Sequence, residues 1–166
     1  QPLPELLAYV EDWDLWRHRL PESREVHDAL ACIPFEFSAW EGLDIILLRA
    51  EGRVLLRYQE MLIRKVSDRA GLGRVGGHEV PVVNCPNSLR SEVGHELLKR
   101  HPQAPFVGMW SIDARGWQGW SLRSRGDFDV SALAARLGGG GHVAASGFRL
   151  PPGEWILAPL GEVPDS

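Results

Sequence analysis

The segment of this sequence best suited to chemistry is a run of four glycines that ends in a histidine. Its residues are Gly138, Gly139, Gly140, Gly141 and His142. Each ordered glycine costs roughly 0.5–1 kcal/mol relative to alanine, and a simple turn needs only one or two. Four in succession present bare backbone whose N–H groups can bind an anion. The residues that follow, 143–146, can begin a helical turn whose dipole adds positive field. His142 can donate a hydrogen bond to a phosphate oxygen. The alternative is a flexible loop with an exposed histidine.

Ser121 and Arg123 are the second candidate for an anion site. On a strand, residues two apart point to one face, while Leu122 between them points to the other. A guanidinium binds phosphate or carboxylate through two parallel hydrogen bonds. The alternative is the solvated polar face of an amphipathic strand.

The acidic segment near the start, Glu11-Asp12-Trp13-Asp14, is the third candidate. Carboxylates two apart on a helix do not share a face. One of them can be a single arm of a metal site whose other ligands lie elsewhere, or both can be surface charges. The other five histidines show no metal-binding spacing and are interpreted as structural or solvent-facing: His18, His27, His78, His95 and His101.

Composition limits the kind of ligand. The 166 residues carry a net charge of −4 with pI about 5.9. That charge argues against coating a polyanion through bulk attraction but leaves room for a local phosphate site. With 44% apolar and 24% charged residues, the chain has the composition of a soluble globular protein. No apolar run is long enough to span a bilayer and no secretory signal opens the chain, so we expect a cytoplasmic protein.

Periodicity predicts helices in the first half of the chain and a mixed pattern in the second. The expected helices cover residues 3–19, 22–32, a short stretch from 39, and 44–69, where Gly52 is a potential break. The glycine-rich stretch 71–77 is interpreted as a boundary. Strands are expected at 79–84, 105–112, 117–123, 147–150 and 155–158, and helices at 87–100 and 129–137. Pro81 indicates an edge strand. The predicted fold class is α/β (α+β), in which an N-terminal helical segment and a long connector helix lead to a small mixed β-sheet domain with flanking helices.

Taken together, these motifs resemble a known family. Ser121-Leu122-Arg123-Ser124, then Asp129-Val130-Ser131, then the glycine run with His142, closely resemble the C-terminal DHH-associated domain of DHH-superfamily phosphoesterases. Residues 9–16 and 20–25 resemble the last segment of the catalytic DHH domain in oligoribonuclease-like and phosphohydrolase-like members. The resemblance implies a catalytic-domain remnant at 1–45, a connector helix at 46–70, the DHH-associated substrate-binding domain at 71–160 and a tail at 161–166.

The resemblance also implies roles for the candidate residues. In such enzymes one domain holds two divalent cations, usually manganese, and the associated domain grips the substrate. Asp12 would be a late metal-ligating carboxylate. Arg123 would hold a substrate phosphate with help from Ser121, and His142 would contact phosphate or the nucleotide end. The four glycines would offer backbone donors.

Two family features are missing from this sequence. It contains no Asp-His-His triplet, and it has no counterpart of the Asp-X-Asp that lies upstream of that triplet in the family. Asp12-Trp13-Asp14 belongs to the later segment. A two-metal centre needs several carboxylate or imidazole ligands, which Asp12 alone cannot supply. The chain as given is therefore expected to bind substrate without cleaving it and to need no cofactor by itself. The opening Gln1-Pro2-Leu3-Pro4, without Met, looks like the middle of a longer gene product, or like a fragment that was processed or prepared from one.

The leading interpretation is the substrate-binding half of a DHH-type phosphodiesterase that acts on short oligonucleotides, dinucleotides or nucleoside phosphates. A second interpretation is a stand-alone module that binds a nucleotide or single-stranded RNA, with Trp117 or Trp120 stacking on bases. A third is an assembly fragment whose apolar face, residues 1–45, seeks a partner, for which a homodimer is one arrangement. None of the three places the chain in a membrane.

Overall fold

The computed structural model describes residues 5–15, 17–154 and 156. The chain divides into two compact units, Gln1–Leu62 and Ile63–Ser166. The expected tail at 161–166 and, apart from residue 156, the expected strand at 155–158 lie outside the described residues. Within the described part of the chain, no helix has the length and apolar character needed to cross a bilayer.

The first unit is helical, as the periodicity predicts. It contains α1 (Glu5–Asp14), α2 (Ser23–Leu30), α3 (Phe37–Trp40) and the first part of α4 (Ile45–Ser67). Its core gathers side chains from α1, α2 and α4, namely Tyr9, Val26, Ala29, Leu30, Ile45 and Leu48. Helix α1 ends at Asp14, five residues earlier than expected, because the Asp12 carboxylate accepts hydrogen bonds from the backbone N–H groups of Arg19 and Leu20. These bonds fold the following loop back onto the helix.

Helix α4 runs unbroken through Gly52, so the expected break there is wrong. A Cβ atom at Gly52 would lie 2.0 Å from the carbonyl oxygen of Glu25 in α2. The glycine therefore lets the backbones of α4 and α2 approach closely. Its place in the sequence reflects packing rather than the end of a helix.

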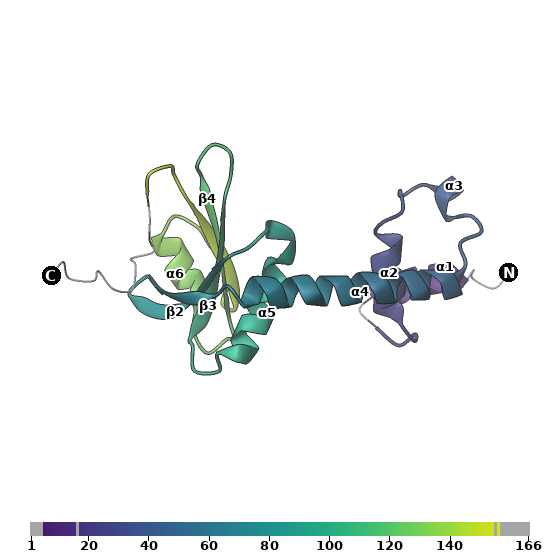
Figure 1. The fold of residues 1–166 in the computed structure, drawn as a ribbon, viewed down its shortest axis with the longest axis horizontal. Coiled ribbons are helices and arrows are strands. Elements are labelled where there is room, and N and C mark those ends of the chain that lie inside the picture. The colour runs from purple at the N-terminus through teal and green to yellow at the C-terminus, as the bar shows by residue number, and fades with distance from the viewer. Residues whose placement is uncertain (1–4, 16, 155, 157–166) are drawn as a thin grey trace. The chain divides into compact units, whose positions relative to one another are not determined.

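The second unit is built on a six-stranded mixed sheet with strand order β1-β2-β3-β4-β6-β5. The strands are β1 (Gly71–Val75), β2 (His78–Asn84), β3 (Phe106–Ile112), β4 (Gln118–Ser124), β5 (Gly140–His142) and β6 (Ala145–Leu150). Among the strands in the described part of the chain, only β2 and β3 pair in parallel. The helices are the 3₁₀ turn η1 (Asn87–Leu89), α5 (Arg90–Arg100) and α6 (Val130–Arg136). Figure 1 labels β2, β3 and β4 of this sheet together with α5 and α6. The predicted fold class is confirmed.

The two faces of this sheet carry different cores. Trp120 and Leu122 of β4 are buried in the cluster that α6 covers, and Val107 and Met109 of β3 are buried in the cluster that α5 covers. Burial alternates along β4, so its intervening residues 119, 121 and 123 lie on the α5 face. Trp120 is only 2% exposed, so the expectation that it stacks on RNA bases is wrong.

Three local expectations in this unit are also wrong. The glycine-rich stretch after α4 is strand β1, not only a boundary. Pro81 does not mark an edge, because β2 lies between β1 and β3; its pairing with β3 begins at Val82, beyond the proline. Residues 143–146 form no helical turn, because the Ala144 carbonyl accepts a hydrogen bond from the Ser124 N–H and strand β6 begins at Ala145.

Candidate functional site

The strand register gathers the predicted anion-binding residues on one face of the sheet. Residues that pair directly on neighbouring strands point to the same face. Two rows cross from β5 through β6 to β4: His142–Ala145–Arg123 and Gly140–Gly147–Ser121. Because neighbouring strands lie about 4.8 Å apart, His142 and Arg123 are separated by one strand, roughly 10 Å at the backbone.

This face is open toward β5 and β6. Helix α5 packs against β3 and β4, while Gly140 and His142 of β5 are exposed. A hollow of about 860 Å³ lies on this half of the sheet, and its lining includes Arg90, Gly139 and Gly147. Ser121, Arg123 and His142 are not among its lining residues, although Ser121 adjoins it through a hydrogen bond with Arg90.

The glycine run ends helix α6 before it reaches the sheet. The Gly138 N–H donates to the Ala135 carbonyl at 3.1 Å, and the Gly139 N–H donates to the Ala134 carbonyl at 2.8 Å. With Gly138 at φ 77°, these two bonds make a Schellman helix terminus. Both amide N–H groups therefore form hydrogen bonds within the chain. The expectation that all four glycines offer free N–H donors to an anion is wrong for Gly138 and Gly139.

Close backbone packing also accounts for the glycines at positions 139 and 141. A Cβ atom at Gly139 would lie 2.1 Å from the Gly147 carbonyl oxygen, and one at Gly141 would lie 2.6 Å from the Ser146 Cα. A Cβ at Gly140 would meet nothing within 4 Å. Gly140 therefore presents bare, accessible backbone on the candidate face, as the sequence interpretation requires.

Arg90, at the start of α5, is the site residue that the sequence interpretation missed. Its guanidinium is buried, with the residue only 9% exposed, and donates to the Ser111 and Ser121 hydroxyls and the Gly119 carbonyl at 2.5, 3.1 and 2.9 Å. Its Nε has no partner. Across residues 5–15, 17–154 and 156, no carboxylate pairs with this cation.

The electrostatic position of Arg90 is unfavourable. Burial lowers the pKa of its guanidinium, and the nearby positive charge of Arg123 lowers it further, against an opposite effect of Cys85. Arginine stays protonated in proteins, so the lowered pKa reflects an uncompensated buried charge. Cations are also disfavoured in the first turn of a helix, which is the sequence signal that could have identified Arg90.

Arg123 is half-buried on the same face as Arg90. Its Nη1 donates to the Leu122 carbonyl at 3.0 Å, a bond within its own strand. A Cβ atom at Gly94 of α5 would lie 2.9 Å from the Arg123 Cγ, so this glycine leaves room for the arginine stem. The arrangement is a pair of cations with neutral partners, next to exposed glycine backbone, and such a set of groups suits an anion.

Asp12 lies in the first unit, and its carboxylate is occupied by the chain itself. It accepts hydrogen bonds from the Arg19 N–H at 2.9 Å, the Leu20 N–H at 3.3 Å and the Ser23 hydroxyl at 2.8 Å. Burial raises the pKa of this carboxyl, but these hydrogen bonds and the charge of His18 bring the pKa below its ordinary value.

The described residues around Asp12 supply no further metal ligands. No group of three or more His, Cys, Asp or Glu side chains that could hold a metal ion occurs among the described residues. The described part of the chain therefore gives Asp12 no co-ligands, and its metal-binding role remains a prediction.

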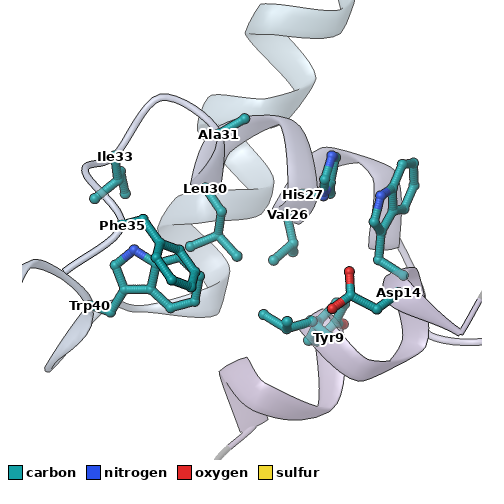
Figure 2. Close-up of a pocket in the computed structure, with 11 residues that line it drawn as sticks. Tyr9, Asp14, Val26, His27, Leu30, Ala31, Ile33, Phe35 and Trp40 are labelled. Carbon is teal, nitrogen blue, oxygen red and sulfur yellow. The ribbon is translucent and has the colours of Figure 1, made fainter. Parts of the chain in front are cut away.

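The first unit has a hollow of its own, of about 310 Å³, between α1, α2 and α3. Figure 2 shows Asp14 and His27 beside it, among apolar and aromatic side chains that include Tyr9, Phe35 and Trp40. No arginine or lysine lines this hollow. Its chemistry does not suit a phosphate, so the face of the sheet in the second unit is the better candidate for an anion site.

No model of a known protein family matches this sequence. Among curated proteins, the chain is 31% identical over 156 residues to an uncharacterized protein of Acanthamoeba polyphaga mimivirus, covering 89% of this chain and 37% of that protein. It is 28% identical over 158 residues to oligoribonuclease NrnB of Bacillus subtilis, covering 86% of this chain and 38% of that protein. The chain thus spans little more than a third of the curated relatives that it matches.

Among solved structures, the chain is similar to a pGpG-specific phosphodiesterase, PggH, from Vibrio cholerae, with 13% identity and a TM-score of 0.47 over 90% of this chain and 63% of that chain. In sequence, the chain is thus similar to part of an oligoribonuclease.

Proposed function

We propose that these residues form the nucleotide-binding part of a DHH-type phosphodiesterase that acts on short oligonucleotides, dinucleotides or nucleoside phosphates. In this proposal the second unit is the DHH-associated domain, and its open sheet face holds a substrate phosphate. The observation that carries it is the buried Arg90 guanidinium, which has only neutral partners and lies beside Arg123. A buried cation without a counter-charge is costly, and a bound phosphate would supply that charge.

Arg123 and His142 would contact the phosphate from the two ends of their row, on either side of Ala145, and the bare backbone of Gly140 and Gly147 would lie in the next row. Arg90 would stabilise the anion from below and orient the Ser121 hydroxyl toward it. Positioning and charge neutralisation of this kind account for much of the catalysis of phosphoryl transfer. We propose no bond-breaking step for the described residues. The divalent cations, manganese by the family resemblance, would be held largely by residues other than these, and the whole enzyme would act in the cytoplasm.

Calorimetric titration with a 5′-phosphorylated dinucleotide tests the proposal. Arg123→Gln removes the charge at a half-buried position whose guanidinium donates to a carbonyl of its own strand, so the fold should survive. A charge-assisted hydrogen bond is worth roughly 1.5–3 kcal/mol, so affinity should fall about 10- to 150-fold. The matched control is Arg74→Gln on β1, at the opposite edge of the same sheet, which should leave affinity unchanged. Equal affinities of the wild type and Arg123→Gln would refute the site.

Further outcomes separate the alternatives. Affinity that rises steeply with oligonucleotide length and falls steeply with salt would favour a module that tracks single-stranded RNA. Phosphodiesterase activity of this chain alone with manganese would overturn the claim that it binds without cleaving.

One observation favours the assembly interpretation as a second candidate function. In the first unit, Phe35 and Phe37 are 88% and 91% exposed, and Ile46 and Leu47 are also exposed. Exposed apolar side chains that gather in one region mark interaction surfaces. Sedimentation velocity tests this: a partner-seeking face predicts association of the chain with itself, while a monomer at all concentrations would count against it.

A further inference from the structure

The loop between β3 and β4 places a tryptophan at the rim of the candidate site. Trp117 is 38% exposed and lines the 860 Å³ hollow together with Asp113 and Arg149. The same three residues line a second hollow of about 450 Å³, so the indole forms part of the wall between the two. Resting on the proposed function, we propose that Trp117, supported by Arg149, is a stacking platform for a nucleobase of the bound substrate.

The loop that carries Trp117 is held in one shape before any ligand binds. The Asp113 carboxylate accepts hydrogen bonds from the Arg115 N–H at 2.9 Å and the Trp117 N–H at 3.0 Å. The Asp113 N–H donates to the Trp117 carbonyl, and the Gly116 N–H donates to the Asp113 carbonyl, both at 2.9 Å. Gly116 takes the φ of 82° that the turn requires. A pre-ordered platform loses little conformational entropy on binding.

Arg149 connects this platform to the sheet. Its guanidinium carbon lies 5.4 Å from the Trp117 ring centroid, and its Nη2 lies 3.1 Å from an Asp113 carboxylate oxygen. Arg149 pairs with Gly119, whose carbonyl accepts from Arg90, so Trp117 and the buried cation adjoin the same row of the sheet. The guanidinium lies over one face of the indole and supports it, and the opposite face is the flat surface on which a base would stack.

The spacing along β4 suits one nucleotide. The row of Ser121 and Gly140 lies two residues from the row of Gly119 and Arg149, about 7 Å along the strand. Trp117 lies two residues beyond that second row, but its ring lies against the Arg149 guanidinium of the row. A phosphate held at the first row and a base on Trp117 can therefore belong to one nucleoside phosphate. Stacking tolerates any base, so the platform selects for the presence of a base and not for its identity.

A pair of ligands that differ only by the base tests this inference: adenosine 5′-monophosphate and ribose 5-phosphate, each titrated by calorimetry. The wild type should bind the nucleotide about 5- to 100-fold more tightly than the sugar phosphate. Trp117→Ala should abolish that difference while leaving ribose 5-phosphate affinity unchanged, which also shows that the variant's phosphate site is folded. Trp117→Phe should keep most of the difference, and Tyr58→Ala, which removes an exposed aromatic of α4, should keep all of it.

The outcomes distinguish this inference from the function on which it rests. Undiminished preference for the nucleotide in Trp117→Ala would overturn the platform alone. Weakening of both ligands by Arg123→Gln, with no wild-type preference between them, would support the phosphate site and overturn the platform. Absence of binding of either ligand to the wild type would overturn both.

Discussion

Two buried charges in this chain have opposite surroundings. The Asp12 carboxylate accepts hydrogen bonds from two backbone N–H groups and a serine hydroxyl, so its charge is stabilised by its own chain. The Arg90 guanidinium meets only neutral oxygens and has the positive Arg123 nearby. The Asp12 charge holds a loop against its helix, whereas the Arg90 charge would be stabilised by a bound anion.

Asp12→Asn should destabilise the first unit at neutral pH and flatten its acid dependence. The folded-state pKa of Asp12 lies below its ordinary value of about 3.9. Its stabilising contribution is therefore fully present above that value and is lost as the pH falls through the folded-state pKa. Urea unfolding at several pH values between 7 and 2.5, followed by circular dichroism, measures both effects.

The matched control for that experiment is Asp14→Asn, the same change on an exposed residue of the same helix. It should leave the midpoint at pH 7 and the acid dependence close to those of the wild type. Wild-type acid dependence retained in Asp12→Asn would show that this carboxylate does not stabilise the folded chain.

The element that decides the shape of the site is the connection from α6 through β5 to β6. The Asp129 carboxylate caps the start of α6 by accepting from the Ser131 and Ala132 N–H groups, and Gly138 and Gly139 terminate the helix. The chain then enters β5 at Gly140 with its backbone against β6. The four glycines therefore have different roles. Gly138 and Gly139 end helix α6, and Gly139 and Gly141 also allow close backbone contact with β6. Gly140 leaves its backbone accessible on the candidate face.

Alanine substitutions at two adjacent glycines should separate these tasks. Gly139→Ala places a methyl group 2.1 Å from a backbone oxygen and should cost about 1–3 kcal/mol or more. Gly140→Ala meets nothing and has no positive φ, so its stability should stay within about 0.5 kcal/mol of the wild type. Thermal unfolding of the two variants compares them directly. A larger loss for Gly140→Ala would contradict this division of roles.

At the scale of the whole molecule, the two units have separate cores. One cluster is confined to α1, α2 and the start of α4, and two clusters lie on the faces of the sheet. Helix α4 contributes Leu48 to the first and Ile63 and Val66 to the second unit. Separate cores are the physical basis for independent unfolding.

Calorimetry should accordingly resolve two unfolding transitions, only one of which responds to ligand. A nucleotide at about 100 times its Kd stabilises the unit that binds it by about 2.7 kcal/mol, which should raise that transition by roughly 10–20 °C. Gly52→Ala, which forces a Cβ against α2, should lower only the other transition. A single transition that moves as a whole with either change would contradict two independent units.

Much of this architecture follows from local pattern. Helical periodicity located α2, α4, α5 and α6 closely, and the strands expected at 105–112 and 117–123 agree closely with β3 and β4. Strand β1 was missed because Gly71 and Gly73 carry no apolar alternation, and its formation depends on pairing with β2. Arg90 was missed because its neighbours Ser111 and Gly119 are distant in sequence.

Residue types and spacing were sufficient to place Ser121 and Arg123 on one side of a strand, since strand geometry has a period of two. They could not decide that β6 lies between β4 and β5, which is what puts His142 and Gly140 on the same side as Arg123. Nor could they show that α5 buries Arg90 without a counter-charge. Strand order and burial depend on contacts between residues far apart in the chain, and those contacts exist only in the folded state.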